Sequence, residues 1–360
     1  MIVLRTTQIR PWRRVLILLA LVSIVFAPAA FAGDVAEIVF FGDSLSDPGN
    51  YFIAFGTVSL APFEPIPDAP YAIGGHHFSN GATWAEQLAW ELRRPASGEP
   101  ALQMPGVFTN YAVGRARARA GAPVFALYDL STQVNRFLSD FGGHASADNV
   151  YALWIGANDL SDALNALATD PTGATSIGII QEAIGAVDAN IQTLWAAGAR
   201  TLLIPNLPDL AITPAVRALG PEAQAVASQL TAAYNGGLEQ ALQALQVLPQ
   251  IRFVRLDISS LLDDVLVDPS DFGLANVEDS CLAFGVVRGA VCERPDGYLF
   301  WDGEHPTRAG HRIIARAALH ALSPVVASCG GEKRSVASFL SVDVARDASV
   351  TRARDDAPQK

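Results

Sequence analysis

Lysine is almost absent from the sequence, and the two lysines that it has, Lys333 and Lys360, lie in the last segment of the chain. Acidic residues outnumber basic ones by 36 to 25, which gives a net charge of -11 at pH 7. Binding to nucleic acid requires Lys and Arg side chains clustered on one face, because they neutralise the phosphates. The composition therefore argues against a nucleic-acid partner and predicts an acidic surface in contact with water.

Cysteine is also scarce. The sequence has three cysteines and no Cys-x-x-Cys pair, and its histidines show no ligand spacing, so we expect neither a metal nor another cofactor. In an exported protein, three cysteines favour one disulfide and one free thiol. Cys281 and Cys292 would close a short loop, which would stabilise the fold by about 3 kcal/mol. Cys329 would then remain unpaired.

The first 32 residues differ from the rest of the chain. Four arginines precede the apolar run 15–26, and Ala30, Phe31 and Ala32 match the small-residue pattern of a cleavage site. We interpret residues 1–32 as a signal peptide, which predicts a periplasmic or secreted protein. The alternative is an uncleaved membrane anchor, since the run 15–32 is only slightly shorter than the roughly 20 residues that span a bilayer. Pro28 and the small-residue ending disfavour that alternative.

Short β-rich runs alternate with longer runs of helical period, which is the pattern of a parallel sheet covered by helices. Half of the 360 residues are apolar, enough for one large core. We therefore predict a single α/β domain over residues 33–329 and a disordered tail at 330–360. The predicted strands are 36–42, 108–113, 150–156, 200–206 and 251–257.

Three long helices are predicted from apolar residues spaced three and four apart. The first ends near Gly198, the second begins at Pro221, and the third follows Thr307, a favourable N-cap. Residues 51–80 and 259–300 show no clear period. They are predicted to be long loops over the carboxyl ends of the strands, where open α/β sheets bind ligands.

A serine follows the first predicted strand. Ser44 stands in the sequence Gly-Asp-Ser-Leu-Ser-Asp at 42–47, so its hydroxyl should emerge at the carboxyl end of the sheet. Its own N–H can then point at a bound carbonyl oxygen. Gly, Asp and Ser also make ordinary turns, which is the alternative interpretation of this segment. A nucleophilic serine would need a base, and an anion to orient that base.

Both of these groups occur together before the last predicted helix. Asp302 and His305 are three residues apart in Asp-Gly-Glu-His-Pro-Thr, so they can meet within one loop. We predict that His305 removes the proton of Ser44 and that Asp302 holds the imidazole in the working tautomer. The structural alternative is that Asp302 caps a turn and His305 merely precedes a helix. The other histidines lack a comparable acidic neighbour.

Three hydrogen-bond donors are predicted for the oxyanion that forms in ester hydrolysis. They are the N–H of Ser44, the N–H of Gly114 and the side-chain amide of Asn158. Gly114 ends the second predicted strand and Asn158 the third, so both should lie at the same sheet edge as Ser44. A glycine lets the backbone approach a ligand closely. Taken alone, either residue is also common in turns.

Together these four blocks resemble the SGNH hydrolases, also called the GDSL family of esterases and lipases. The blocks lie at 42–47, 113–114, 156–159 and 302–305, in the order of the family, and the resemblance covers about residues 35–322. It implies a flavodoxin-like three-layer α/β/α fold with a parallel sheet of about five strands. The sequence agrees, because it has no Gly-x-Ser-x-Gly elbow of the larger α/β-hydrolases.

Two details accompany this resemblance. Segments 78–81 and 206–209 are similar to segments of the lipase-like branch that shape the loops around the site. Many relatives place a second glycine after the oxyanion glycine, where this chain has Arg115. A guanidinium at the mouth of the site could alter which acyl or alcohol group is accepted.

The sequence therefore predicts an exported serine esterase or lipase that works through an acyl-enzyme on Ser44. The substrate would be a small-molecule or lipid ester, and the apolar loops around 51–63 and 272–284 favour a lipid-like ester and peripheral contact with membrane lipid. An acyltransferase or a carbohydrate acetylesterase would use the same residues, so both stay open. A non-catalytic binding module is disfavoured because Ser44, Asn158 and His305 are all present. The oligomeric state is not predicted.

Overall fold

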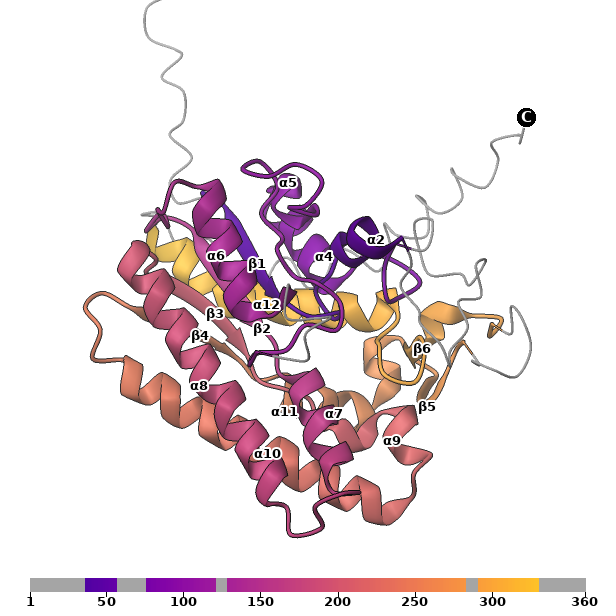
Figure 1. Ribbon diagram of the computed structural model, residues 1–360. Helices are drawn as coiled ribbons and strands as arrows, with labels where there is room; N and C mark the ends of the chain where they lie inside the picture. The colour runs from indigo at the N-terminus through magenta and orange to yellow at the C-terminus, as the bar shows by residue number, and fades with distance from the viewer. Residues whose placement is uncertain (1–35, 57–75, 121–127, 283–290, 330–360) are drawn as a thin grey trace, which may run out of the picture. The chain divides into compact units, whose positions relative to one another are not determined.

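The computed structural model describes residues 36–56, 76–120, 128–282 and 291–329 (Figure 1). The predicted signal peptide at 1–32 and the predicted tail at 330–360 lie outside these residues, as does the side chain of Cys329. The chain divides into two units, and the larger one, Val35–Pro324, contains the elements described below apart from the last residues of α12.

A parallel sheet of four strands forms the centre of this unit, in the order β1-β2-β3-β4. Every residue of the first three strands is buried, as their apolar runs predicted. The strands are β1 Ile38–Gly42, β2 Val150–Trp154, β3 Thr201–Pro205 and β4 Arg252–Leu256.

The second predicted strand, 108–113, does not form a regular strand, although it lies beside β1. Tyr111 donates to the carbonyl of Phe40 at 2.8 Å, and Val113 donates to that of Gly42 at 3.1 Å. The N–H of Gly42, which would continue this ladder, donates instead to Oε1 of Gln133 at 2.9 Å. A side-chain bond thus takes the place of one strand-pairing bond. The segment thus occupies the place of a fifth strand with an interrupted ladder.

Helices cover both faces of the sheet. Successive side chains of a strand point to opposite faces, and Phe40 packs edge-to-face on Trp84 of α4 (Trp84–Glu91), whereas Phe41 packs edge-to-face on Phe137 of α6 (Leu130–Asp140). In Figure 1, α6 and α8 (Ala174–Ala197) lie in front of the sheet and α12 (Arg308–Cys329) lies behind it. The predicted three-layer α/β/α fold is confirmed.

The three predicted helix boundaries are also confirmed. Helix α8 ends at Ala197 with Gly198 as its C-cap, α10 spans Pro221–Leu245, and α12 begins directly after Thr307. The other helices are α2 Asn50–Phe55, α5 Pro95–Gly98, α7 Ala157–Ala166, α9 Pro214–Arg217 and α11 Ile258–Val267, with 3-10 helices at Leu210–Ile212, Pro269–Phe272 and Pro295–Gly297.

The prediction of a long loop at 259–300 is wrong. This stretch contains most of α11 and a small parallel sheet of β5 (Asn276–Ser280) and β6 (Tyr298–Phe300). The side chain of Asn206 accepts the N–H groups of Ile258 and Ser259 at the start of α11, at 2.7 and 3.0 Å. These bonds add to a local N-cap, because the side chain of Asp257 accepts the N–H of Ser260 at 3.1 Å. The sequence therefore carried a local signal for the start of α11 that the search for periodicity did not use.

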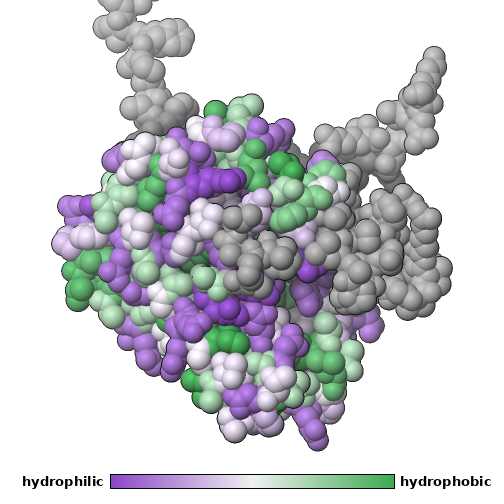
Figure 2. All heavy atoms as spheres, viewed as in Figure 1, coloured by the Kyte–Doolittle hydropathy of each residue, from purple (hydrophilic) through white to green (hydrophobic). Residues whose placement is uncertain are grey.

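Apolar side chains that remain exposed come from several elements, among them Ile53, Trp90, Ile177 and Val267. On the face shown in Figure 2, apolar residues are interspersed among polar ones. Within the described ranges, no helix combines the length and the apolar character needed to cross a membrane.

Candidate active site

The structure brings Ser44, His305 and Asp302 together in one chain of hydrogen bonds. Ser44 follows β1, and the other two lie between β6 and α12. The Nε2 atom of His305 lies 2.8 Å from Oγ of Ser44. Its Nδ1 atom lies 2.8 Å from Oδ2 of Asp302. A carboxylate on Nδ1 holds the proton there and leaves Nε2 as the acceptor that faces the serine hydroxyl.

The Asp302–His305 loop is shaped mainly by its own residues. Oδ1 of Asp302 accepts the N–H of Glu304 at 2.8 Å and the N–H of His305 at 2.7 Å. The carbonyl of His305 in turn accepts the N–H of Trp301 at 2.7 Å. The carboxylate therefore orients both the imidazole and the backbone that carries it.

The two partners shift each other's pKa in opposite directions. Burial raises the pKa of Asp302, but the charge and hydrogen bond of His305 outweigh burial and hold that pKa below its usual value. Burial lowers the pKa of His305, but the charge and hydrogen bond of Asp302 outweigh it and raise that pKa. The imidazole is thus a stronger base than a free histidine.

Asp43 directly precedes the nucleophile in the chain and is almost completely buried. Its Oδ1 accepts the N–H of Leu45 at 3.0 Å, whereas Oδ2 is buried without a hydrogen-bond partner among the described residues. Burial raises the pKa of Asp43 to about 7, although the nearby charge of His305 opposes this rise. Besides Asp302, the site thus contains a second carboxyl group, that of Asp43, which can bind a proton. Among the described residues, no hydrogen bond joins it to the hydroxyl of Ser44.

The side chain of Asn158, a predicted oxyanion donor, lies at the active-site cleft. It lines the same cleft as Ser44 and His305, and Nδ2 donates one hydrogen to the carbonyl of Ala116 at 2.9 Å. An amide nitrogen has two hydrogens. The second has no acceptor among the described residues.

Gly114 does not have the geometry expected of an oxyanion donor. Its N–H donates to Oδ2 of Asp47 at 2.7 Å, so its single hydrogen is already used. The glycine is required here for another reason, because a Cβ atom at this position would lie 2.3 Å from the ring of Phe78. Tertiary contacts, which the sequence pattern does not show, decide where this N–H points.

Two buried carboxylates that sequence reasoning missed hold the backbone around Gly114. Asp47 accepts the N–H groups of Gly49, Asn50 and Tyr51 in addition to that of Gly114. Asp159, next to Asn158, accepts the N–H of Ala118 at 2.8 Å and pairs with Arg119. Burial raises the pKa of each carboxyl to about 6. Asp47 lies in the block 42–47 and Asp159 in the block 156–159, and these positions are the signal by which the sequence could have revealed them.

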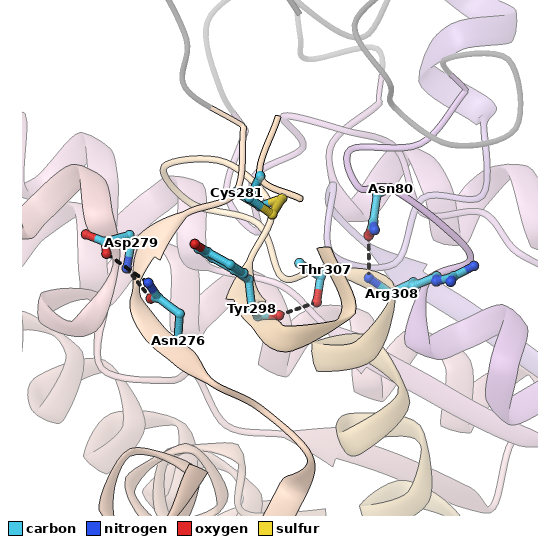
Figure 3. The surroundings of a disulfide bond; sticks show 8 residues. Asn80, Asn276, Asp279, Cys281, Tyr298, Thr307 and Arg308 are labelled. Atoms are coloured by element: carbon cyan, nitrogen blue, oxygen red, sulfur yellow. Dashed lines mark hydrogen bonds between the residues drawn. A yellow bond between two sulfur atoms is a disulfide. The ribbon is translucent and has the colours of Figure 1, made fainter. Parts of the chain in front are cut away.

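A disulfide and a small sheet brace the other side of the site (Figure 3). Cys281 and Cys292, the pair expected from their spacing, form a disulfide next to β5. β5 pairs with β6, which leads directly into Trp301 and Asp302. The hydroxyl of Thr307 donates to the carbonyl of Tyr298 at 2.6 Å. These contacts connect the disulfide to the loop that carries His305.

The loop at 78–81 contacts the same region. The hydroxyl of Ser79 donates to the carbonyl of Pro306 at 2.8 Å, and Oδ1 of Asn80 accepts the N–H of Arg308 at 2.7 Å (Figure 3). The ring of Phe78 lies 5.3 Å from that of His305. This segment therefore shapes the loop around the site, as its resemblance implied. In the described part of the chain, no group of three or more His, Cys, Asp or Glu side chains could hold a metal ion.

The fold and the hydrogen-bonded Ser44, His305 and Asp302 define a class, the α/β serine hydrolases. The chain belongs to the GDSL-like lipase/acylhydrolase family, whose family model matches residues 38–318. The protein is a carboxylic ester hydrolase of this family.

Three comparisons describe its neighbours. The chain is 27% identical to GDSL esterase/lipase 5 of Arabidopsis thaliana over 78% of its length and 82% of that protein's. It is 26% identical to phosphatidylcholine-sterol acyltransferase of Aeromonas hydrophila, over 84% of this chain and 94% of that protein. Among solved structures, an acetyl xylan esterase of Geobacillus stearothermophilus aligns with 14% identity and a TM-score of 0.43, covering 84% of this chain and 99% of that one.

Proposed function

We propose that the protein is an exported serine esterase in which Ser44 is the nucleophile, His305 the general base and Asp302 the residue that orients the base. The observation that carries this proposal is the continuous set of hydrogen bonds from Asp302 through His305 to Oγ of Ser44. Among the described residues that line the cleft, Ser44 and His305 are the one pair of nucleophile and base within hydrogen-bond distance of each other.

The reaction follows from this geometry. His305 takes the proton of Ser44 as the hydroxyl attacks the ester carbonyl. The oxyanion is stabilised by the second hydrogen of Asn158 and by the N–H of Ser44, which has no acceptor among the described residues. His305 then gives its proton to the leaving alcohol, and water releases the acid from the acyl-enzyme by the same steps. Because the base must be neutral, activity should rise as the pH passes through the raised pKa of His305.

The location of the protein is part of the proposal. The Arg-rich start, apolar run and small-residue ending of residues 1–32 support export to the periplasm or the medium. The disulfide between Cys281 and Cys292 also supports it, because disulfides persist in oxidising compartments. A small-molecule or lipid ester is the proposed substrate, with peripheral contact with membrane lipid in the second case.

The direct test is the hydrolysis of chromogenic esters by the wild type and by Ser44→Ala. The variant should lose at least about 10³-fold in kcat, because it retains only the oxyanion donors and substrate binding. Ser270→Ala is the matched control, since Ser270 is an exposed serine far from the site in sequence and should leave the rate unchanged. Equal rates for Ser44→Ala and the wild type would refute the nucleophile assignment.

Acyl transfer is the second candidate, and the similarity to the Aeromonas hydrophila acyltransferase supports it. In that case an alcohol would replace water as the acceptor of the acyl group from Ser44. Product analysis in the presence of a long-chain alcohol separates the two activities. New ester in excess of free acid indicates a transferase, whereas free acid alone indicates a hydrolase.

A further inference from the structure

The cleft that starts at Ser44 has polar residues at one end and apolar walls beyond it. Ser44, Asn158, Glu304 and His305 form the polar end. The apolar walls come from the sheet, the 3-10 helix Leu210–Ile212 and helices α9, α11 and α12. They include Trp154, Leu210, Ile212, Val216, Leu262 and Ile314.

The polar atom of the largest wall residue is already bonded outside the cleft. The indole N–H of Trp154 donates to the carbonyl of Asn206 at 3.0 Å, so the ring presents an apolar surface. Among the described residues beyond the polar end, Ser161 and Thr213 are the wall residues with side-chain hydroxyls, and that of Thr213 donates to the carbonyl of Leu210 at 2.7 Å. A sugar would find few hydrogen-bond partners on these walls, whereas a hydrocarbon chain would displace water from them.

We infer that this cleft binds the acyl chain of the substrate, and that butyryl to octanoyl esters are preferred over acetyl esters. The inference rests on the proposed function, because it takes Ser44 as the acylated residue. The acyl group stays bonded to Oγ after the alcohol has left, so the apolar cleft that begins at Oγ can hold its chain through both steps. The alcohol position must instead admit the water that hydrolyses the acyl-enzyme. Each methylene group buried in the cleft should raise kcat/KM about fourfold.

Ile212 offers a way to change the cleft without changing the reacting groups. Its side chain is partly buried and lines the cleft. Ile212→Trp should fill part of the cleft and lower kcat/KM for octanoyl esters about tenfold or more, with the acetyl ester changed by less than about twofold. Ile212→Ala should shift the optimum toward longer chains. Leu219→Trp is the matched control, because Leu219 is 67% exposed and does not line the cleft.

The experiment measures kcat/KM for acetyl, butyryl, octanoyl and palmitoyl esters of one alcohol, and for octanoyl esters of several alcohols. A preference of the wild type for acetyl would overturn the inference, as would an Ile212→Trp variant in which all acyl lengths decline equally. The inference would also be overturned if Ile212→Trp changed the preference among alcohols and left the preference among acyl lengths unchanged. Activity that survives in Ser44→Ala would instead refute the proposed function, so the two failures are distinguishable. Thermal unfolding of each variant confirms folding.

A second, independent observation concerns the turn at 113–116. The N–H of Ala116 donates to the carbonyl of Val113 at 3.1 Å, and Arg115 has φ 65°, a left-handed conformation that a long side chain rarely adopts. The N–H of Gly114 is bonded to Asp47. Among the residues that the structure describes, nothing accepts the N–H of Arg115.

The contacts of this turn place it at the polar end of the cleft. The carbonyl of Ala116 accepts from Nδ2 of Asn158 at 2.9 Å. On its other side Gly114 packs against Phe78, whose ring lies 5.3 Å from that of His305. We propose that the N–H of Arg115, and not that of Gly114, is the third oxyanion donor. Strained backbone of this kind is typical of functional sites.

A crystal structure of the enzyme phosphonylated at Ser44 tests this proposal. The phosphonyl oxygen that mimics the oxyanion should lie about 2.7–3.1 Å from the backbone nitrogen of Arg115. Its contact with the nitrogen of Gly114 instead, with the bond to Asp47 broken, would overturn the proposal.

Discussion

The two halves of the active site are held in place in different ways. Within the Asp302–His305 loop, one carboxylate binds the imidazole and two backbone N–H groups that lie two and three residues away. The segment 114–119 instead depends on residues distant in sequence, with Asp47 holding Gly114 and Asp159 holding Ala118. The comparison teaches that contacts within one loop hold the imidazole of His305, whereas two carboxylates distant in sequence hold the segment 114–119.

The largest expected effect comes from breaking the local half. Asp302→Asn should lower kcat about 10³- to 10⁴-fold, because an amide favours the wrong tautomer of His305. Steady-state kinetics measures the loss, and circular dichroism checks that the variant is folded. Asp296→Asn is the control, since Asp296 is an exposed carboxylate paired with Arg308 and should change kcat little. Equal losses in both variants would contradict a specific role for Asp302.

Asp43, which directly precedes Ser44 in the chain, should make the free energy of unfolding depend on pH. Its pKa is raised from 3.8 to about 7, so the folded state favours its neutral form. That contribution to stability is present below about pH 4 and is lost as the pH rises through about 7. The free energy of unfolding of Asp43→Asn minus that of the wild type should therefore be about 3 to 4 kcal/mol higher at pH 8 than at pH 4.

Urea denaturation at several pH values measures this difference. Asp148→Asn, at an exposed carboxylate, should show no such change with pH. A parallel pH dependence for Asp43→Asn and the wild type would contradict the raised pKa.

Removal of the disulfide tests whether the Asp302–His305 loop depends on contacts outside itself. The double variant Cys281→Ser, Cys292→Ser should lose about 3 kcal/mol in free energy of unfolding, because the unfolded chain regains the freedom of the short loop. At temperatures well below unfolding its kcat should stay near that of the wild type, since the hydrogen bonds of Asp302 do not involve either cysteine. A large loss in kcat with unchanged stability would show that the disulfide positions His305 directly.

The smallest expected effect comes from weakening the long-range half. Asp47→Asn removes one of two acceptor oxygens, so the N–H groups of Gly114 and Tyr51 lose their partner. The cost in free energy of unfolding should be about 2 kcal/mol, accompanied by a lower kcat as segment 114–119 moves. Asp271→Asn is an exposed control. A variant with wild-type stability and kcat would contradict the long-range dependence.

The same contrast explains what the sequence could predict. Asp302 and His305 were assigned from their spacing in one loop, and Ser44 from its place after a strand. Gly114 was assigned as a donor because it ends the run 108–113, but the direction of its N–H depends on Asp47, 67 residues away. By contrast, α11 was missed although its N-cap is local, since the side chain of Asp257 accepts the N–H of Ser260 at 3.1 Å. The triad was predictable from local spacing, whereas the direction of the Gly114 N–H, which a distant carboxylate sets, was not.

The central claim is that Ser44 is activated by His305, and covalent labelling tests it most directly. A fluorophosphonate should modify the wild type once, on the peptide that contains Ser44, as shown by mass spectrometry. His305→Ala should react at least about 10³-fold more slowly, since the hydroxyl has lost its base. Labelling of a different residue, or an undiminished labelling rate in His305→Ala, would contradict the account.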